Sequence, residues 1–143
     1  MFLIKHISFN TFDHEDAYHV GCDLVEKVKK ENLKNIRIRV VLNQEIVFQY
    51  LMNGKSGDTW LNRKQKTVEV FKQASYFTWQ ENEISNQYEK YLSDETMAIG
   101  GGGYPIIVKD KMIGCIVVSG LSHDQDHQII VSVLRQYKNK QEN

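Results

Sequence analysis

The 143-residue chain lacks any run of about 18 to 20 consecutive apolar residues, the length that a membrane-spanning helix requires. Residues 1–12 also lack the charged start and the apolar stretch of a signal peptide. Because neither feature of a membrane or secreted protein is found, we expect a cytoplasmic protein.

The sequence also has little cysteine and no net charge. Cys22 and Cys115 form no CxxC pair, which favours reduced structural thiols over a disulfide or a zinc site. The 18 basic residues balance the 18 acidic ones, so the excess of positive charge that is typical of nucleic-acid-binding proteins is missing. The basic segments KVKKENLK and RKQK fall on predicted helices, where a solvated surface explains them. We therefore expect neither a nucleic-acid nor a membrane partner.

The composition is otherwise that of an ordinary globular protein. Hydrophobic residues make up 41% of the chain and charged residues 25%, so neither a disordered nor a membrane protein is indicated. The length suits one domain with a substantial core. We expect residues 1–143 to form a single domain whose core spans about residues 13–137.

Apolar periodicity and turn residues divide the chain into helices and strands. Asp13 and Asp16 mark the start of a first helix, and Asp58 is the expected N-cap of a second helix that turns Trp60 inward. Ser122 and Gln125 are spaced as a capping box for the last helix. The predicted elements are a helix 13–31, a hairpin 36–51, helices 58–74 and 81–92, a hairpin 104–120, and a helix 123–137.

The order of these elements predicts the fold class. Strands that come as hairpins, without alternation of single strands and helices, favour an α+β domain over a parallel nucleotide-binding sheet. We expect a profilin-like antiparallel sheet built from two hairpins and flanked by helices, in the order α-β-β-α-α-β-β-α.

Four of the nine glycines stand together as Gly100, Gly101, Gly102 and Gly103, just before Tyr104. Such a run suits a cradle for an anionic ligand, a tight subunit contact or a flexible turn. It is not a phosphate-binding P-loop, because it opens onto a strand and not onto the N-terminus of a helix.

Trp60, Arg63 and Lys64 lie close together on the second predicted helix. The simpler interpretation is that both cations reach from the helix border to water. Two cations beside a tryptophan also suit an anion site. We predict that residues 100–104 form a tight, positive-φ approach that faces Trp60, Arg63 and Lys64, so that glycine N–H groups and both cations converge on one anion-sized space.

Catalytic and metal-binding patterns are weak. His123 and His127, four residues apart, are the best metal candidates, together with a neighbouring aspartate, but helix capping explains them more simply and we expect no metal. Ser119 lacks the G-x-S-x-G pattern of a nucleophile elbow, and the apolar neighbours of Cys115 indicate a buried, inert thiol. No catalytic residue can be named from the sequence.

Several segments together resemble a known family. GGGGYPIIV, IGCIVVSGL, the pair Asp126–His127 and WLNRK at residues 60–64 make the chain similar to the haem-degrading-domain family of GlcG-like proteins, over about residues 13–137. Within that family it resembles an uncharacterised branch of short, stand-alone members. The resemblance implies a profilin-like α+β domain, homo-oligomers, and haem as a ligand that is bound or degraded.

The chain departs from that branch at three positions. Arg39 replaces an acidic residue of the first strand, Gln44 replaces a glycine at the hairpin tip, and Ser122 replaces a proline. Arg39 would reverse the charge near any pocket at the first strand. The fold expectation is unaffected.

Three functions follow from these observations. The first is a homo-oligomeric domain that binds a small ligand, with haem or a related planar anionic cofactor as the leading candidate. The alternative is a non-catalytic, homo-oligomeric adaptor in which the glycines form subunit contacts. The third is an enzyme that breaks down a tetrapyrrole with an external reductant.

Overall fold

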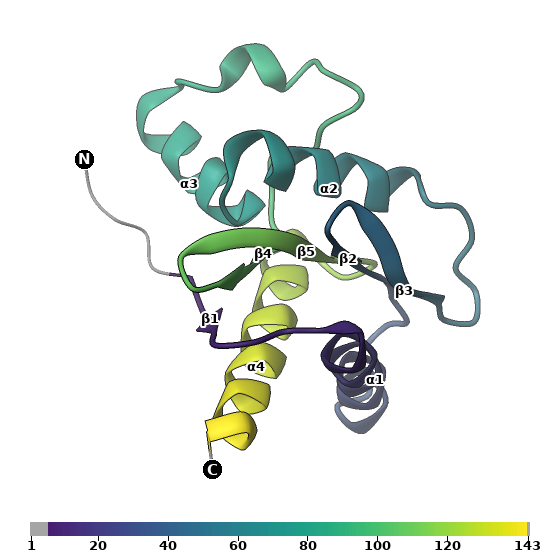
Figure 1. The fold of residues 1–143 in the computed structure, drawn as a ribbon. Helices are drawn as coiled ribbons and strands as arrows, with labels where there is room; N and C mark the ends of the chain where they lie inside the picture. The colour runs from purple at the N-terminus through teal and green to yellow at the C-terminus, as the bar shows by residue number, and fades with distance from the viewer. Residues whose placement is uncertain (1–5, 143) are drawn as a thin grey trace.

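The computed structural model describes residues 6–142, which fold into a mixed five-stranded sheet with helices on both faces (Figure 1). The α+β class is the one predicted from the sequence. The elements are β1 (Ser8–Phe9), α1 (His14–Lys30), β2 (Arg37–Leu42), β3 (Glu45–Leu51), α2 (Thr59–Phe71), α3 (Ser75–Ser85), the 3₁₀ turn η1 (Glu89–Tyr91), β4 (Gly103–Val108), β5 (Lys111–Ser119) and α4 (His123–Glu142).

The two predicted hairpins are confirmed as β2–β3 and β4–β5. Both are antiparallel, and β5 pairs with β2, so the strand order is β1-β4-β5-β2-β3. Each hairpin turns through two residues with positive φ, Asn43 and Gln44 in the first and Lys109 and Asp110 in the second. Such turns match the right-handed twist of the strands that they join. Gln44 therefore takes a left-handed conformation, which glycine adopts more readily than other residues.

One strand was missed in the sequence. β1 pairs with β4 in parallel, Ser8 with Ile107 and Phe9 with Val108, so the sheet is mixed and not wholly antiparallel. Two residues are too few to show an alternating pattern. The approach to β1 is fixed by a hydrogen bond that the backbone N–H of Ile7 donates to the Tyr104 hydroxyl, at 2.7 Å.

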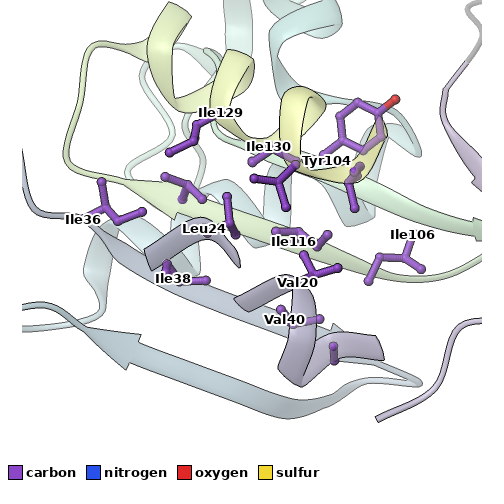
Figure 2. Close-up of a cluster of buried hydrophobic side chains, with 14 of the residues drawn as sticks. Val20, Leu24, Ile36, Ile38, Val40, Tyr104, Ile106, Ile116, Ile129 and Ile130 are labelled. Carbon is purple, nitrogen blue, oxygen red and sulfur yellow. The ribbon is translucent and has the colours of Figure 1, made fainter. Parts of the chain in front are cut away.

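Helices α1 and α4 cover one face of the sheet, while α2 and α3 lie on the other (Figure 1). Figure 2 shows the larger core, in which side chains of α1 and α4 pack on those of the central strands. Its fully buried members include Val20, Leu24, Ile38, Val40, Ile106, Ile116 and Ile130. A smaller cluster lies beneath α2 and consists of Val41, Leu61, Val68, Cys115 and Val117. Because successive residues of β2 and β5 point to opposite faces, these strands supply both cores.

Two helix starts follow the predicted caps. The Asp13 side chain accepts a hydrogen bond from Asp16 N, and Asp16 accepts one from Asp13 N, so a reciprocal capping box begins α1. Ser122 and Gln125 make the same exchange before α4. That helix continues to Glu142, beyond the expected end at residue 137.

Two details of the predicted helices were wrong, and one predicted cap lacks its side-chain bond. α3 starts at Ser75 and ends at Ser85, where Asn86 turns left-handed with a φ of 56°, so the segment 81–92 is not one helix. Asp58 is the N-cap residue of α2, as predicted, but its side chain makes no capping bond and its Oδ2 lies 3.6 Å from Arg39 Nη2. Trp60 does not point inward, since 46% of it is exposed. Within residues 6–142, no helix is both long and apolar enough to cross a membrane.

The burial of Ile116 in the larger core predicts that its loss costs much more stability than the loss of an exposed isoleucine. Ile116→Ala should lower the free energy of unfolding by about 2–5 kcal/mol, because the fully buried side chain would leave a cavity in the larger core. Ile84→Ala is the matched control, since Ile84 is 88% exposed and should cost no more than about 0.5 kcal/mol. Urea denaturation measures both, and equal losses would contradict this packing.

Candidate functional site

A pocket of about 560 Å³ opens where α2, the segment 91–101 and the turn between β5 and α4 meet. This volume is within the range of small-molecule binding sites. We call it the α2 pocket. Its lining residues are Arg37, Trp60, Arg63, Lys64, Trp79, Tyr91, Leu92, Met97, Ala98, Ile99, Gly100, Gly101, Ser119, Gly120, Leu121, His123 and Asp126.

The pocket brings together five of the eight predicted site residues, although they come from distant parts of the chain. Trp60, Arg63 and Lys64 of α2 and Gly100 and Gly101 of the glycine run all contribute to its lining. The other three do not line it, and they are Gly102, Gly103 and Tyr104. Tyr104 is buried in the sheet, where its hydroxyl accepts the hydrogen bond from Ile7.

Three members of the glycine run, Gly101, Gly102 and Gly103, are required by close approach within the chain itself. A Cβ atom on Gly102 would lie 2.5 Å from Lys64 Nζ and 2.6 Å from the Val118 carbonyl oxygen. A Cβ on Gly101 would collide with the carbonyl oxygen of His123, and one on Gly103 would lie 2.5 Å from Val68 Cγ2. The packing of the chain therefore accounts for these glycines without a subunit contact.

Two details of the predicted glycine cradle were wrong. Among the described residues, Gly102 is the one member of the run with a positive φ, at 126°. The backbone N–H of Gly101 donates to His123 Nδ1 at 3.1 Å, and that of Gly103 donates to Ser75 Oγ at 3.0 Å. Both N–H groups are therefore engaged with side chains of the same chain and do not form an anion cradle.

Lys64 neither reaches water nor presents a free charge to the pocket. It is 7% exposed, and its Nζ donates to Asp126 Oδ2 at 2.8 Å and to the Val118 carbonyl oxygen at 2.9 Å. Burial raises the pKa of Asp126, while the Lys64 ammonium and the backbone N–H of Leu121 act in the opposite direction. No local pattern in the sequence indicated this pairing, although Asp126 belongs to one of the segments that carried the family resemblance.

Two arginines supply the positive charge of the pocket. Arg63 donates from Nε to the Met97 carbonyl oxygen at 2.9 Å, and its guanidinium carbon lies 4.3 Å from the centre of the Trp60 ring. Arg37, which the sequence analysis missed, is held by the carbonyl oxygens of Ser56 and Gly57. Within residues 6–142, the terminal Nη1 and Nη2 groups of Arg63 have no hydrogen-bond partner. They are donors that a carboxylate of a ligand could use.

Arg39 does not reverse the charge of this pocket. It projects from the α2-facing side of β2, as Arg37 does, but lies outside the pocket lining. Its guanidinium is buried and donates hydrogen bonds to Gln49, Asn62 and Gln65. Arg39 is therefore accommodated beneath α2, outside the pocket.

An aromatic wall completes the pocket, and the sequence analysis missed its main member. The Trp79 and His123 rings meet edge to face with 4.8 Å between their centres. Tyr76 lies behind them, 5.5 Å from His123 and stacked on His127 at 4.6 Å. Trp79 belongs to α3, which the predicted helix boundaries did not include.

The weak metal candidates His123 and His127 both lie beside Tyr76. His127 is buried, its Nδ1 has no partner among the described residues, and burial lowers its pKa to about 4. No group of three or more His, Cys, Asp or Glu side chains that could hold a metal ion is found in the part of the chain that the structure describes. Cys115 is buried as expected, which raises its pKa to about 12.

The family model of the haem-degrading protein HbpS and its relatives matches residues 12–135. The chain belongs to the HbpS-like family. It is 30% identical to the UPF0303 protein of Psychromonas ingrahamii, over 90% of this chain and 84% of that protein. It is also 30% identical to a UPF0303 protein of Yersinia pestis, over 93% and 81% of the two chains. The resemblance seen in the sequence is thus confirmed.

Solved structures agree with this assignment. The Ybr137w protein is 27% identical, with a TM-score of 0.83 over 94% of this chain and 82% of its own. HbpS, at 18% identity, has a TM-score of 0.70 over 94% and 93% of the two chains. The PduOC–haem complex, also at 18% identity, has a TM-score of 0.71 over 87% and 93%. The last two comparisons establish that the HbpS-like family fold is shared.

The tight space around Gly102 yields a stability prediction. Gly102→Ala should lower the free energy of unfolding by clearly more than about 1 kcal/mol, because the added methyl group meets both an unfavourable φ and the Lys64 and Val118 atoms. Gly57→Ala is the matched control, since Gly57 also has a positive φ, of 76°, but open space around its Cβ. Thermal and urea unfolding compare the two, and equal costs would contradict the tight packing.

The lowered pKa of His127 leads us to expect a loss of stability in acid. Its pKa is about 4 in the folded chain and its ordinary value is 6.5, so the unfolded chain binds a proton first as the pH falls. The His127 contribution to stability should therefore be full above about pH 6.5 and should decline toward pH 4. Unfolding measured across this range should show a weaker pH dependence in His127→Phe than in the wild type. His19→Phe, at an exposed position on α1, should keep the wild-type dependence.

Proposed function

We propose that the α2 pocket binds a small planar ligand that carries carboxylates, and that haem or a related tetrapyrrole is the leading candidate. The observation that supports this most is the meeting of an aromatic wall, Trp79 and His123, with the open guanidinium end of Arg63 in one pocket. Aromatic faces suit a planar ring, and arginine forks suit carboxylates.

The pocket residues fit the organic part of haem. Trp79, Leu92 and Ile99 would contact the ring, while Arg37 and Arg63 would hold the propionates. When bound, haem iron supplies redox and oxygen chemistry, and it needs an axial donor such as His, Met or Tyr. Among the described lining residues, His123 is the one imidazole. The protein contribution is therefore binding and orientation of the ring, and degradation of haem by this chain stays a prediction.

The adaptor alternative has lost its main argument. It relied on the glycine run as a subunit contact, but the space beside these glycines is occupied by His123, Lys64 and Val68 of the same chain. Assembly into a homo-oligomer stays a prediction. β3 is compatible with it as an edge strand that carries the exposed Ile46 and Tyr50.

Replacement of Arg63 tests the proposed function. Haemin titrated into the purified chain should bind saturably at one per pocket, and Arg63→Ala should weaken binding by about tenfold because a charged partner of the carboxylates is lost. The free energy of unfolding should fall by only about 1 kcal/mol, since the half-buried Arg63 side chain loses one hydrogen bond, the one to the Met97 carbonyl oxygen.

Arg135→Ala is the matched control, because Arg135 is exposed on α4 and outside the pocket. Its haemin affinity should equal that of the wild type. Titrations of the wild type that fail to saturate, or equal losses in the two arginine variants, would refute binding in the α2 pocket.

A further inference from the structure

The hydrogen bond between Gly101 and His123 fixes where the proton of this imidazole lies. Gly101 N–H can only donate, so His123 Nδ1, 3.1 Å away, must accept with its lone pair. A neutral imidazole carries one proton, which is therefore on Nε2. His123 thus presents an N–H group, and not a lone pair, at its other nitrogen.

The surroundings hold the ring in this orientation. Gly101 cannot shift toward α4, because its Cα is already packed against the carbonyl oxygen of His123. Trp79 packs edge to face against the imidazole with 4.8 Å between ring centres, and the Tyr76 ring lies beside Trp79, 5.5 Å from the imidazole. The nearest carboxylate oxygen to Nε2, Oδ1 of Asp124, is 3.7 Å away, which is too long for a hydrogen bond. Within residues 6–142, the Nε2–H group has no hydrogen-bond acceptor.

This arrangement is the reverse of the one found at metal sites. A histidine that binds a metal offers a lone pair from one nitrogen and donates the N–H of the other to an oxygen. His123 accepts at Nδ1 and would have to lose its Nε2 proton, or its bond to Gly101, before it could bind iron. As it stands, the ring fits an oxygen acceptor of a ligand and does not fit an iron atom.

We propose that the α2 pocket recognises its ligand by the planar ring and the carboxylate oxygens, with His123 as a hydrogen-bond donor that determines specificity, and that His123 makes no bond to iron. The inference rests on the proposed function and specifies its ligand class. The ligand is a planar ring with carboxylates, and His123 contributes equally to the binding of a tetrapyrrole with or without iron. Arg63 supplies further donors for the same oxygens.

Three probes separate iron from carboxylate recognition. Haemin, iron-free protoporphyrin IX and protoporphyrin IX dimethyl ester are titrated into the full chain in the same dilute detergent, and binding is followed by quenching of the fluorescence of Trp60 and Trp79. Haemin and protoporphyrin IX should bind with dissociation constants within about threefold of each other, and the ester should bind about tenfold more weakly. A preference of more than about thirtyfold for haemin over protoporphyrin IX that is present in the wild type and lost in His123→Gln would overturn the proposal.

Variants of His123 test the donor directly. His123→Phe should weaken both acids about tenfold, and His123→Gln, which keeps a side-chain N–H, should recover part of that loss. The Soret band and the electron paramagnetic resonance spectrum of bound haemin should be the same in the wild type and in His123→Gln. A change in either spectrum would show that His123 binds iron and would overturn the proposal.

The controls distinguish the two levels of the argument. His19→Phe, at an exposed position on α1, should bind all three probes as the wild type does. Saturable binding of the acids that is insensitive to His123 would refute the inference and leave the proposed function standing. If none of the probes binds saturably, the proposed function fails and the inference fails with it. Should His123→Phe not fold, the wild-type probe series and the His123→Gln spectra still decide.

Discussion

The buried ion pair between Lys64 and Asp126 is the interaction on which the α2 pocket depends. It joins α2 to α4, and through the Val118 carbonyl oxygen it joins both helices to the end of β5. Transfer of two charges out of water is costly, and removal of one partner would leave the other charge buried and unpaired. The pair is therefore stable only while α2, α4 and β5 keep their present spacing.

That spacing explains the glycine run. With Lys64 Nζ held against Val118, the chain that enters β4 has room to pass only where Gly102 has no side chain. Gly101 then lies against His123 at the start of α4, and its N–H fixes the imidazole. The lysine that the sequence suggested as an anion ligand thus has a different role. It places the glycines, and the glycines orient the side chain that can meet a ligand.

Local signals in the sequence were sufficient for much of the fold. The capping pairs at Asp13 and Ser122 act within three residues, and two-residue turns between alternating strands define both hairpins, so these elements could be predicted. The Lys64–Asp126 pair could not, because its members are 62 positions apart and nothing local distinguishes a paired lysine from one that reaches water. β1 was too short to show an alternating pattern. Trp79 was missed because the predicted helix began at residue 81, whereas α3 starts at Ser75.

The charge of the pocket depends on which charged side chains are already paired within the chain. Lys64 and Asp126 cancel one another, and Arg39 is committed to Gln49 and to two side chains of α2, so the charge left for a ligand comes from Arg37 and Arg63. Both arginines are tethered by backbone carbonyl oxygens, which limits the entropy lost when they bind. The carboxylates of the proposed ligand would thus meet donors that are already in place, and the aromatic wall would require only a flat ring. Neither requirement involves a metal atom, so membership of a haem-degrading family and recognition of an iron-free ring are compatible in this pocket.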